Sequence, residues 1–390
     1  MYDSIIIGCG FCGSIIARKL AEEQDKKILV IDRRNHIAGN MYDELNSNGI
    51  RIQKYGPHVF HTNISEVYEY ISRFTSWIPS KLLCRAEIDG IFTPSPFNFN
   101  TIDTFFPECS EELKSELIKE YKGRETATIV ELLESSNQLI KKYAEFLFEK
   151  DYRLYTSKQW GIPPESIDVS VLKRVPVILS YEDSFFRDKY ECFPKDGFVS
   201  LFENILNHKN IEVRLNCEAS EVLKFDFNNR KIYYENEEYT KPVIFTGELD
   251  KLMNFKYGQL PYRSIYFDFK DIDRDRYQEV PLIVFPQAKD YTRITEYSQF
   301  PPQKTNGTTT IAYEYPLQYL PNAERGNEPY YPIINDDNIS IYNKYRDDAQ
   351  KILNLYVCGR LGDYKYYNMD NAIMRAFEVY KDIVSKFIRV

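Results

Sequence analysis

The sequence predicts an α/β fold in which a discontinuous Rossmann-like domain carries a helical insertion and a second domain built on an antiparallel sheet. Three observations lead to this prediction: a strand, glycine triplet and helix at the start of the sequence, a helix-rich stretch at 108–149, and several strand-like runs without intervening helices at 262–315. Because 390 residues exceed what one hydrophobic core normally organises, we expect more than one domain.

The stretch 4–32 predicts a dinucleotide-binding unit. The apolar run Ile5 to Ile7 is typical of a parallel strand that is buried on both faces. Three glycines follow at G-x-G-x-x-G spacing: Gly8, Gly10 and Gly13. The first allows a tight turn, the second lets the backbone approach a pyrophosphate, and the third lets helix and strand pack closely. A second apolar run ends at Asp32, near the ~20-residue distance at which a carboxylate holds a ribose hydroxyl.

The helical insertion is predicted from composition after Pro107. The sequence from 108 to 149 has one glycine and no proline, and its apolar residues recur at helical spacing. One predicted helical face holds Leu113, Leu117, Ile118 and Tyr121. We therefore expect two or more amphipathic helices that pack on each other or on a partner chain.

The remaining elements divide between the two sheets. A helix at 198–206, a strand at 211–215, a hairpin turning at 228–229 and a strand at 243–245 are predicted to return to the first domain. The antiparallel sheet is predicted from the runs 262–270, 280–285, 291–297 and 308–315. A last strand at 355–358 and a helix at 371–388 close the first domain.

The expected domain boundaries follow from this order. The nucleotide domain takes residues 1–95, 191–250 and 336–390, and the helical insertion takes 96–150. The antiparallel-sheet domain, which is expected to complete the substrate site, takes 151–190 and 251–335.

Composition excludes several classes of function. The formal charge of −8 argues against a nucleic-acid surface, which usually needs a basic face. No run approaches the ~18 apolar residues of a membrane span. Seven scattered cysteines, an odd number, and a sequence that begins directly with a strand predict a reducing, cytoplasmic location.

No metal site is predicted. Cys9 and Cys12 form a C-x-x-C pair, but no second pair lies at the spacing of a four-ligand site, so we interpret them as small residues in a crowded turn. His58 and His61 lie three residues apart without a Cys, Asp or Glu partner nearby. A loop that packs against a bound ring system is the preferred interpretation.

A bound cofactor is expected to supply any difficult chemistry. No P-loop and no Ser–His–Asp order stands out, whereas the glycine triplet and Asp32 indicate a dinucleotide. The last strand, Gly359 and the last helix bring a second helix N-terminus toward that ligand. Because this positive end suits the negative charge of a reduced flavin, FAD is the predicted cofactor.

Six motifs along the whole chain resemble those of the bacterial UDP-galactopyranose mutases, and they occur in the right order. They are KYGPHVFHTN (54–63), YTSKQWG (155–161), KRVPV (173–177), YTRI (291–294), EPYYP (328–332) and GRLGDYKYYNMD (359–370). The resemblance implies FAD in the first domain, a homodimer formed through the helices, and a mobile loop whose arginine closes over the diphosphate of the substrate.

The resemblance also implies the reaction. The family exchanges the six-membered and five-membered ring forms of a nucleotide-linked galactose, without net redox change. N5 of the reduced flavin attacks the anomeric carbon, and UDP leaves and later returns. The enzyme is therefore expected to be active only when FAD has been reduced, by NAD(P)H or another external reductant.

The roles of individual residues are carried over from the matching motifs. Arg174 and Arg293 are expected to bind the diphosphate, Tyr155 to stack on uracil with Trp160 nearby, and Tyr315 and Tyr366 to donate hydroxyl groups to the phosphates. His58 and His61 are expected to border the flavin and the sugar. The set expected to hold the cofactor is Gly8, Gly10, Gly13, Asp32, Arg33, Gly39, Asn40, His58, His61, Arg360, Met369 and Asn371.

Four positions depart from the family pattern. Asn368 stands where the family has an aspartate that is expected to act in catalysis, and Phe185 stands where a substrate-binding tyrosine is expected. Ala38 replaces a glycine, and Ile178 replaces an arginine. The lost polar groups leave the sugar and the nucleotide open.

UDP-galactopyranose is the preferred substrate. The same chemistry on dTDP-fucose, a UDP-N-acetylhexosamine or a deoxyheptose nucleotide is the alternative. An FAD-dependent oxidoreductase of the amine-oxidase type and an inactive sugar-nucleotide-binding protein also stay open.

Overall fold

Five parallel strands form the nucleotide sheet in the computed structural model, which describes residues 1–161 and 175–387. The strand order is β12-β2-β1-β16-β22. The strands are β1 (Ser4–Ile7), β2 (Ile28–Ile31), β12 (Ile211–Arg214), β16 (Val243–Phe245) and β22 (Leu355–Val357). Every pairing in this sheet is parallel. The discontinuous Rossmann-like sheet is therefore confirmed.

Both faces of this sheet are covered, which explains its continuous apolar strands. Ile6 and Val30 pack toward α1 (Phe11–Glu23), α9 (Gly197–Leu206) and α14 (Met369–Phe387). Ile5 and Leu29 alternate to the other face, on a second core. That second core includes side chains of α11 (Leu249–Leu252), α12 (Asp336–Ala349), β13 (Leu223–Asp226) and β14 (Lys231–Tyr234). The predicted hairpin is confirmed by the antiparallel pairing of β13 with β14, which β15 (Glu237–Glu238) extends.

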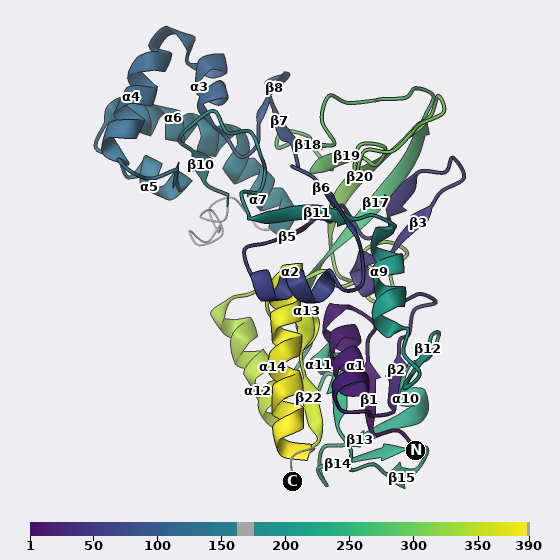
Figure 1. Cartoon of the computed structure of the whole chain (residues 1–390). Helices are drawn as coiled ribbons and strands as arrows, with labels where there is room; N and C mark the ends of the chain where they lie inside the picture. The colour runs from purple at the N-terminus through teal and green to yellow at the C-terminus, as the bar shows by residue number, and fades with distance from the viewer. Residues whose placement is uncertain (162–174, 388–390) are drawn as a thin grey trace.

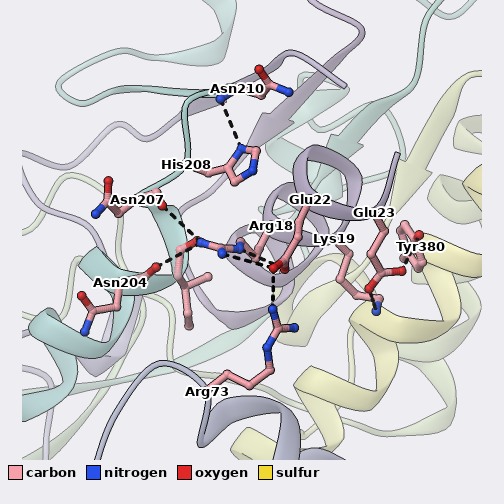
Figure 2. Close-up of polar contacts among 11 residues, drawn as sticks. Arg18, Lys19, Glu22, Glu23, Arg73, Asn204, Asn207, His208, Asn210 and Tyr380 are labelled. Carbon is pink, nitrogen blue, oxygen red and sulfur yellow. Dashed lines mark hydrogen bonds and ion pairs between the residues drawn. The ribbon is translucent and has the colours of Figure 1, made fainter. Parts of the chain in front are cut away.

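Polar contacts fix the outer face of α1 to three other segments (Figure 2). Arg18 donates to carbonyl oxygens in and just after the last turn of α9, and Glu22 accepts a hydrogen bond from Arg73. Glu23 accepts from the hydroxyl of Tyr380 on α14 at 2.7 Å. Segments far apart in sequence therefore hold the first helix in a fixed position.

The second sheet has seven strands among the described residues, in the order β21-β17-β20-β19-β18-β7-β8. Its strands are β7 (Cys84–Ile88), β8 (Ile91–Pro94), β17 (Tyr262–Ile272), β18 (Leu282–Val284), β19 (Arg293–Glu296), β20 (Thr309–Gln318) and β21 (Tyr331–Pro332). All pairings are antiparallel except that of β18 with β7. The four predicted strand runs between 262 and 315 are thus confirmed.

The helical insertion forms a lobe at the far end of the molecule from the nucleotide sheet (Figure 1). Its helices are α3 (Phe99–Phe105), α4 (Ser110–Glu120), α5 (Ile129–Leu133) and α6 (Gln138–Leu147), which continues through the π-helical turn Phe148–Tyr152 into α7 (Arg153–Trp160). β9 (Thr126–Ala127) and β10 (Val177–Ile178) pair beside them. Leu113 and Leu117 are buried as predicted, whereas Ile118 is 54% exposed and lies outside that core.

Smaller elements lie between the nucleotide sheet and the seven-stranded sheet (Figure 1). A three-stranded sheet has the order β5-β11-β6, and a hairpin joins β3 to β4. These elements, with the short helices of the nucleotide domain, are β3 (Asp43–Leu45), β4 (Arg51–Gln53), β5 (Phe60–Thr62), β6 (Trp77–Pro79), β11 (Tyr190–Pro194), α2 (Ser65–Ile71), α10 (Ala219–Val222) and α13 (Gly359–Gly362), together with 3₁₀ turns at Gly39–Met41 and Pro107–Cys109.

Two predicted domain boundaries need correction. The sequence predicts that residues 84–94 belong to the nucleotide domain, but β7 and β8 extend the seven-stranded sheet, because β7 pairs with β18. The boundary at 150 falls inside the continuous helical run from α6 to α7. Both errors arise because sequence patterns reveal an element but not the sheet or helix to which it joins.

None of the described helices combines the length and the apolar character that a bilayer crossing demands.

Candidate functional site

The glycine loop between β1 and α1 shapes an open cradle. A Cβ atom added at Gly13 would lie 2.0 Å from the carbonyl oxygen of Gly8, so helix and strand touch there. A Cβ atom added at Gly10 would meet nothing within 4 Å. Gly10 is also the N-cap of α1 and has no side chain to satisfy the first amide groups of that helix. The cradle therefore offers free space and N–H donors to an anion, as a pyrophosphate site requires.

Asp32 lies directly beside this cradle. Its carboxylate accepts hydrogen bonds from the amide of Cys9 at 2.8 Å and from the amide of Arg34 at 2.9 Å. Cys9 and Cys12 are both buried, in agreement with their interpretation as small residues of a crowded turn. The acid at the end of β2 and the glycine loop thus form one unit.

The following loop, which includes the predicted residues Arg33, Gly39 and Asn40, folds back on the cradle. Both Arg33 and Arg34 pair with Glu328, at 3.0 and 2.7 Å, and Arg34 also donates to Asn40. A Cβ atom added at Gly39 would lie 3.2 Å from the Cα atom of Gly10. Ala38, where the family has glycine, is in the left-handed region with φ of 72°, a conformation that costs an L-residue roughly 1–2 kcal/mol.

The third side of the cradle comes from residues after β22. Gly359 has φ of 90°, and its amide donates to the carboxylate of Asp363 at 3.1 Å. Arg360 donates to the carbonyl oxygens of Tyr367 at 2.6 Å and Tyr330 at 3.3 Å. The predicted residues Met369 and Asn371 lie in the first turn of α14, a second helix N-terminus at the site.

His58 is held as a neutral imidazole. Its Nδ1 donates to the carbonyl oxygen of Gly56 at 2.7 Å, which leaves Nε2 as an acceptor. Gln53 contacts both backbone polar groups of His58. Burial, with the charges of Arg360 and Arg293 nearby, lowers the pKa of His58 to about 3. His58 therefore lies close to both arginines and carries no charge at neutral pH.

This lowered pKa predicts a pH dependence of stability. Because the folded-state pKa of His58 lies below its ordinary value, the unfolded chain binds more protons between pH 6.5 and pH 3, and the free energy of unfolding falls as the pH drops through this window. Between pH 7 and pH 5 we expect His58 to contribute a loss of about 2 kcal/mol, which His58→Asn should remove. Urea unfolding at pH 7 and at pH 5 measures this change in the free energy of unfolding, and His208→Asn is the control. An equal loss in wild type and His58→Asn would contradict this account.

Arg293 lies on β19 opposite Glu314 on β20. Its Nε and one terminal nitrogen donate to the same carboxylate oxygen at 2.9 and 2.6 Å, and the Glu314 side chain is only 1% exposed. The carboxylate fixes the guanidinium while one side of it stays accessible, since the Arg293 side chain is 22% exposed. This is a suitable anchor for an anion, because a planar guanidinium binds phosphate oxygens in pairs.

Tyrosine rings surround the two arginines. Tyr331 stacks on Tyr366 with ring centroids 5.5 Å apart, and the guanidinium carbon of Arg360 lies 5.2 Å from each ring centroid. Burial raises the pKa of Tyr331, and burial also raises the pKa of Tyr155, in both cases against the opposing charge of Arg293. Their hydroxyls therefore stay protonated and can donate hydrogen bonds to an anion.

The helix α7 supplies the predicted nucleobase residues. Tyr155 lies on this helix, and Trp160 ends it just before Gly161, whose φ of 62° terminates the helix. Arg263 of β17 donates to the carbonyl oxygens of Gln159 at 3.0 Å and Lys158 at 3.4 Å, which satisfies the last turn. Arg174, the second predicted diphosphate ligand, lies outside the described residues.

Tyr315 does not belong to this cluster. Successive residues of a strand point to opposite faces of the sheet, and Glu314 points to Arg293, so Tyr315 points away from Arg293. Its ring lies 6.0 Å from that of Tyr266 and 6.3 Å from that of Tyr291. The prediction that Tyr315 binds the diphosphate together with Arg293 is wrong, because the two side chains lie on opposite faces of the sheet. Tyr331 of the EPYYP motif lies in the cluster instead, and its position beside Arg360 was not evident from the sequence.

Comparisons with known proteins identify the family of the chain. The family described as UDP-galactopyranose mutase matches residues 150–366, and the family described as NAD(P)-binding Rossmann-like domain matches residues 6–74. A UDP-galactopyranose mutase of Mycoplasma genitalium is 33% identical over 388 residues, which are 98% of this chain and 95% of that relative. The chain belongs to the UDP-galactopyranose mutase family.

Members of this family named for different sugars are equally similar to the chain. A dTDP-fucopyranose mutase of Escherichia coli is also 33% identical, over 97% of each chain. The crystal structure of a reduced UDP-galactopyranose mutase has a TM-score of 0.74 at 17% identity and covers 99% of this chain and 94% of its own, which shows a shared fold. The chain is thus an isomerase of a family that interconverts pyranose and furanose forms of nucleotide sugars, and the similarity leaves the sugar open.

Two of the four departures from the family pattern, Asn368 and Ile178, lie far apart in the structure. Asn368 directly precedes α14, and its carbonyl oxygen accepts a hydrogen bond from the amide of Ala372 at 3.1 Å. It is two residues from Tyr366 in the sequence and therefore lies at the edge of the arginine and tyrosine cluster. Ile178 is 2% exposed and pairs with Thr126 in the helical insertion. This last departure therefore serves the packing of the insertion and lies outside the cluster.

Phe185 and His61 belong to a separate aromatic group. His61 lies on β5, stacks on Phe186 with centroids 3.7 Å apart, and contacts Asp188 through Nδ1 at 2.6 Å. Phe185 meets Phe186 edge-on, with ring centroids 4.8 Å apart.

In residues 1–161 and 175–387, no group of three or more His, Cys, Asp or Glu side chains is placed to hold a metal ion. The role of His61 beside the flavin stays a prediction.

Proposed function

We propose that this protein is an FAD-dependent mutase that interconverts the pyranose and furanose forms of a nucleotide-linked hexose, with UDP-galactose as the first candidate. The observation that carries the proposal is the convergence of Arg293 and Arg360 with Tyr155, Tyr331 and His58 next to the glycine cradle. A diphosphate needs such a set of guanidinium and hydroxyl donors. An amine substrate does not, so this cluster argues against an oxidoreductase of the amine-oxidase type.

The residues of the cradle fit FAD as the cofactor. The empty space over Gly10 and the first turn of α1 suit the pyrophosphate, and Asp32 lies where a ribose is expected. Arg360 and the first turn of α14, with Met369 and Asn371, would hold the ring system. In its reduced state, FAD supplies the nucleophilic nitrogen that displaces the nucleotide from the anomeric carbon of the sugar.

The protein's own residues serve the departing diphosphate. Arg293, fixed by Glu314, neutralises negative charge that grows on the phosphate oxygens, and Arg174 is proposed to do the same. The hydroxyls of Tyr331 and Tyr366 donate to those oxygens. Tyr155 stacks on the nucleobase near Trp160, so that the sugar is held in one orientation.

A second candidate sugar has specific support. Asn368 replaces a charged carboxylate with a neutral amide that both donates and accepts hydrogen bonds. The loss of a charge suits a sugar with fewer hydroxyls, and a relative of equal identity is named for dTDP-fucopyranose. A deoxyhexose linked to dTDP is therefore the runner-up.

The test is turnover of a panel of nucleotide sugars by the purified protein, with its flavin either oxidised or reduced by dithionite. We expect the protein to be yellow, and we expect conversion only in the reduced state, without stoichiometric use of reductant. Asn368→Asp should then shift the ratio of kcat/KM between UDP-galactopyranose and dTDP-fucopyranose, because a charge at the start of α14 changes which hydroxyl is bound. Folding should tolerate this variant, since an acidic residue is favourable at a helix N-terminus.

Three outcomes would count against these proposals. Equal activity of oxidised and reduced protein would exclude the reduced cofactor as the nucleophile, and an unchanged ratio in Asn368→Asp would remove position 368 from specificity. If the reduced protein turns over no sugar nucleotide, the inactive-homologue alternative is favoured. The homodimer through residues 96–150 and the cytoplasmic location stay predictions.

A further inference from the structure

Lys158, in the second half of α7, places its ammonium group among backbone carbonyl oxygens of a single loop. This loop, residues 285–292, joins β18 to β19. Nζ of Lys158 donates to the carbonyl oxygens of Phe285 at 2.8 Å, Pro286 at 3.1 Å, Ala288 at 2.5 Å and Tyr291 at 2.8 Å. We call these four oxygens the carbonyl cage. Since an ammonium has three N–H donors, the cage offers an acceptor to each of them.

The charge of Lys158 is compensated by the backbone, because the hydrogen bonds of its side chain, among the described residues, all go to this cage. Asp151 and Asp290 act on it electrostatically without a hydrogen bond. Burial lowers the pKa of Lys158 to about 8, so the group still carries its charge at pH 7. A half-buried cation without the cage would lose much of its hydration and gain little in return.

The helix and the loop that Lys158 joins each carry or adjoin residues of the proposed substrate contacts. On the helix, Tyr155 and Trp160 flank Lys158 and are the proposed nucleobase residues. The loop ends at Thr292, and the next residue is Arg293, the proposed diphosphate ligand. The loop is also packed through Tyr291, whose ring lies 5.3 Å from that of Phe285 and 5.1 Å from that of Tyr313.

We propose that Lys158 is a positioning residue that locks the loop 285–292 to α7 and thereby fixes the distance between the nucleobase side and the diphosphate side of the substrate site. This inference rests on the proposed function, because it assigns those two sides to Tyr155 and Arg293. Lys158 acts through these residues. Without it, the same contacts would form only after the loop had been ordered by the substrate itself, at the expense of affinity.

The first test compares Lys158→Ala with Lys150→Ala. Lys150 is a matched control, since it pairs with Asp89 at 2.9 Å, and Asp89 in turn contacts Gln287 of the same loop. We expect Lys158→Ala to raise KM for the nucleotide sugar roughly tenfold, with a smaller change in kcat, because one charge-assisted anchor is lost. Amide hydrogen exchange across 285–292 should become faster in Lys158→Ala and stay at the wild-type rate in Lys150→Ala.

The second test is chemical rescue of Lys158→Ala by small cations. Methylammonium carries N–H donors and should slow the amide exchange of the loop and lower KM again. Tetramethylammonium has the same charge but no N–H group, so it should do neither. Equal effects of the two salts, or wild-type exchange in Lys158→Ala, would overturn the positioning role. Amide exchange needs no substrate, so this result stands even if no sugar nucleotide is turned over, which would refute the proposed function instead.

Discussion

Arg293→Ala is expected to lower kcat/KM by roughly a hundredfold, which corresponds to ~3 kcal/mol of transition-state stabilisation. The guanidinium is held at 2.6 Å from Glu314 and keeps one accessible side, so it is oriented before the substrate arrives. As the diphosphate leaves, its negative charge grows, and a fixed positive charge in a partly buried site stabilises this state more than the bound substrate. Steady-state kinetics with the reduced enzyme and the best nucleotide sugar of the panel measures the effect.

The same substitution also disturbs the fold, and a second variant separates the two effects. Without Arg293 the carboxylate of Glu314 is left buried and unpaired, which typically costs about 3 to 5 kcal/mol of stability. Arg293→Ala combined with Glu314→Gln removes that charge and should recover most of the lost thermal stability, but not the activity. Arg274→Ala, at an exposed position on the same domain, is the control. Near-normal kinetics of the combined variant would show that Arg293 only balances Glu314.

Gly13→Ala is expected to lose stability, whereas Gly10→Ala is expected to keep its stability and to lose affinity for FAD. A methyl group at Gly13 would lie 2.0 Å from the backbone oxygen of Gly8, so β1 and α1 would have to separate, at a cost of about 3 kcal/mol or more. A methyl group at Gly10 meets no protein atom within 4 Å, and the extended backbone there, with φ of −79°, accepts alanine. We expect Gly10→Ala to keep wild-type stability within about 1 kcal/mol and to bind FAD at least roughly tenfold more weakly.

Thermal unfolding of the cofactor-free proteins and the flavin content after purification distinguish the two variants. Gly13→Ala should unfold at lower temperature whether or not FAD is added, because its defect lies between protein atoms. Gly10→Ala should unfold like wild type without FAD and gain less stability from it. A yellow, fully loaded Gly10→Ala protein would place the pyrophosphate elsewhere than the cradle.

The parts of the fold that the sequence predicts best are those whose signals are local. The run from β1 to Asp32 was identified from spacing alone, since three glycines and two apolar runs follow one another within 32 residues. The sheet to which β7 and β8 belong was not, because the pairing of Cys84 with Leu282 joins segments far apart in sequence. The pattern of apolar residues in a strand shows which side chains share a face of the sheet, but it does not show which other strand pairs with it.

The site shows the same division. Arg293 was found from its motif, but its partner Glu314 becomes visible only when β19 and β20 are paired. Tyr315 and Tyr331 both lie in tyrosine-rich segments, and only the alternation along β20 shows that Tyr315 faces away. The carbonyl cage around Lys158 leaves no trace in the sequence, because every residue type carries a backbone oxygen.

The strand order of the nucleotide sheet also decides when, during synthesis, the cradle can be completed. β1 and β2 are made first, but β16 pairs with β1 only after residue 245 exists, and β22 follows at residues 355–357. Ribosomes add roughly 5–20 residues per second, so an interval on the order of 20 to 60 seconds separates β2 from β22. Throughout the first part of this interval the apolar β1 has an unpaired edge, which nascent chains expose to aggregation. We therefore expect the proposed nucleotide cofactor to bind only after translation has passed β22, because residues that follow this strand form the third side of the cradle.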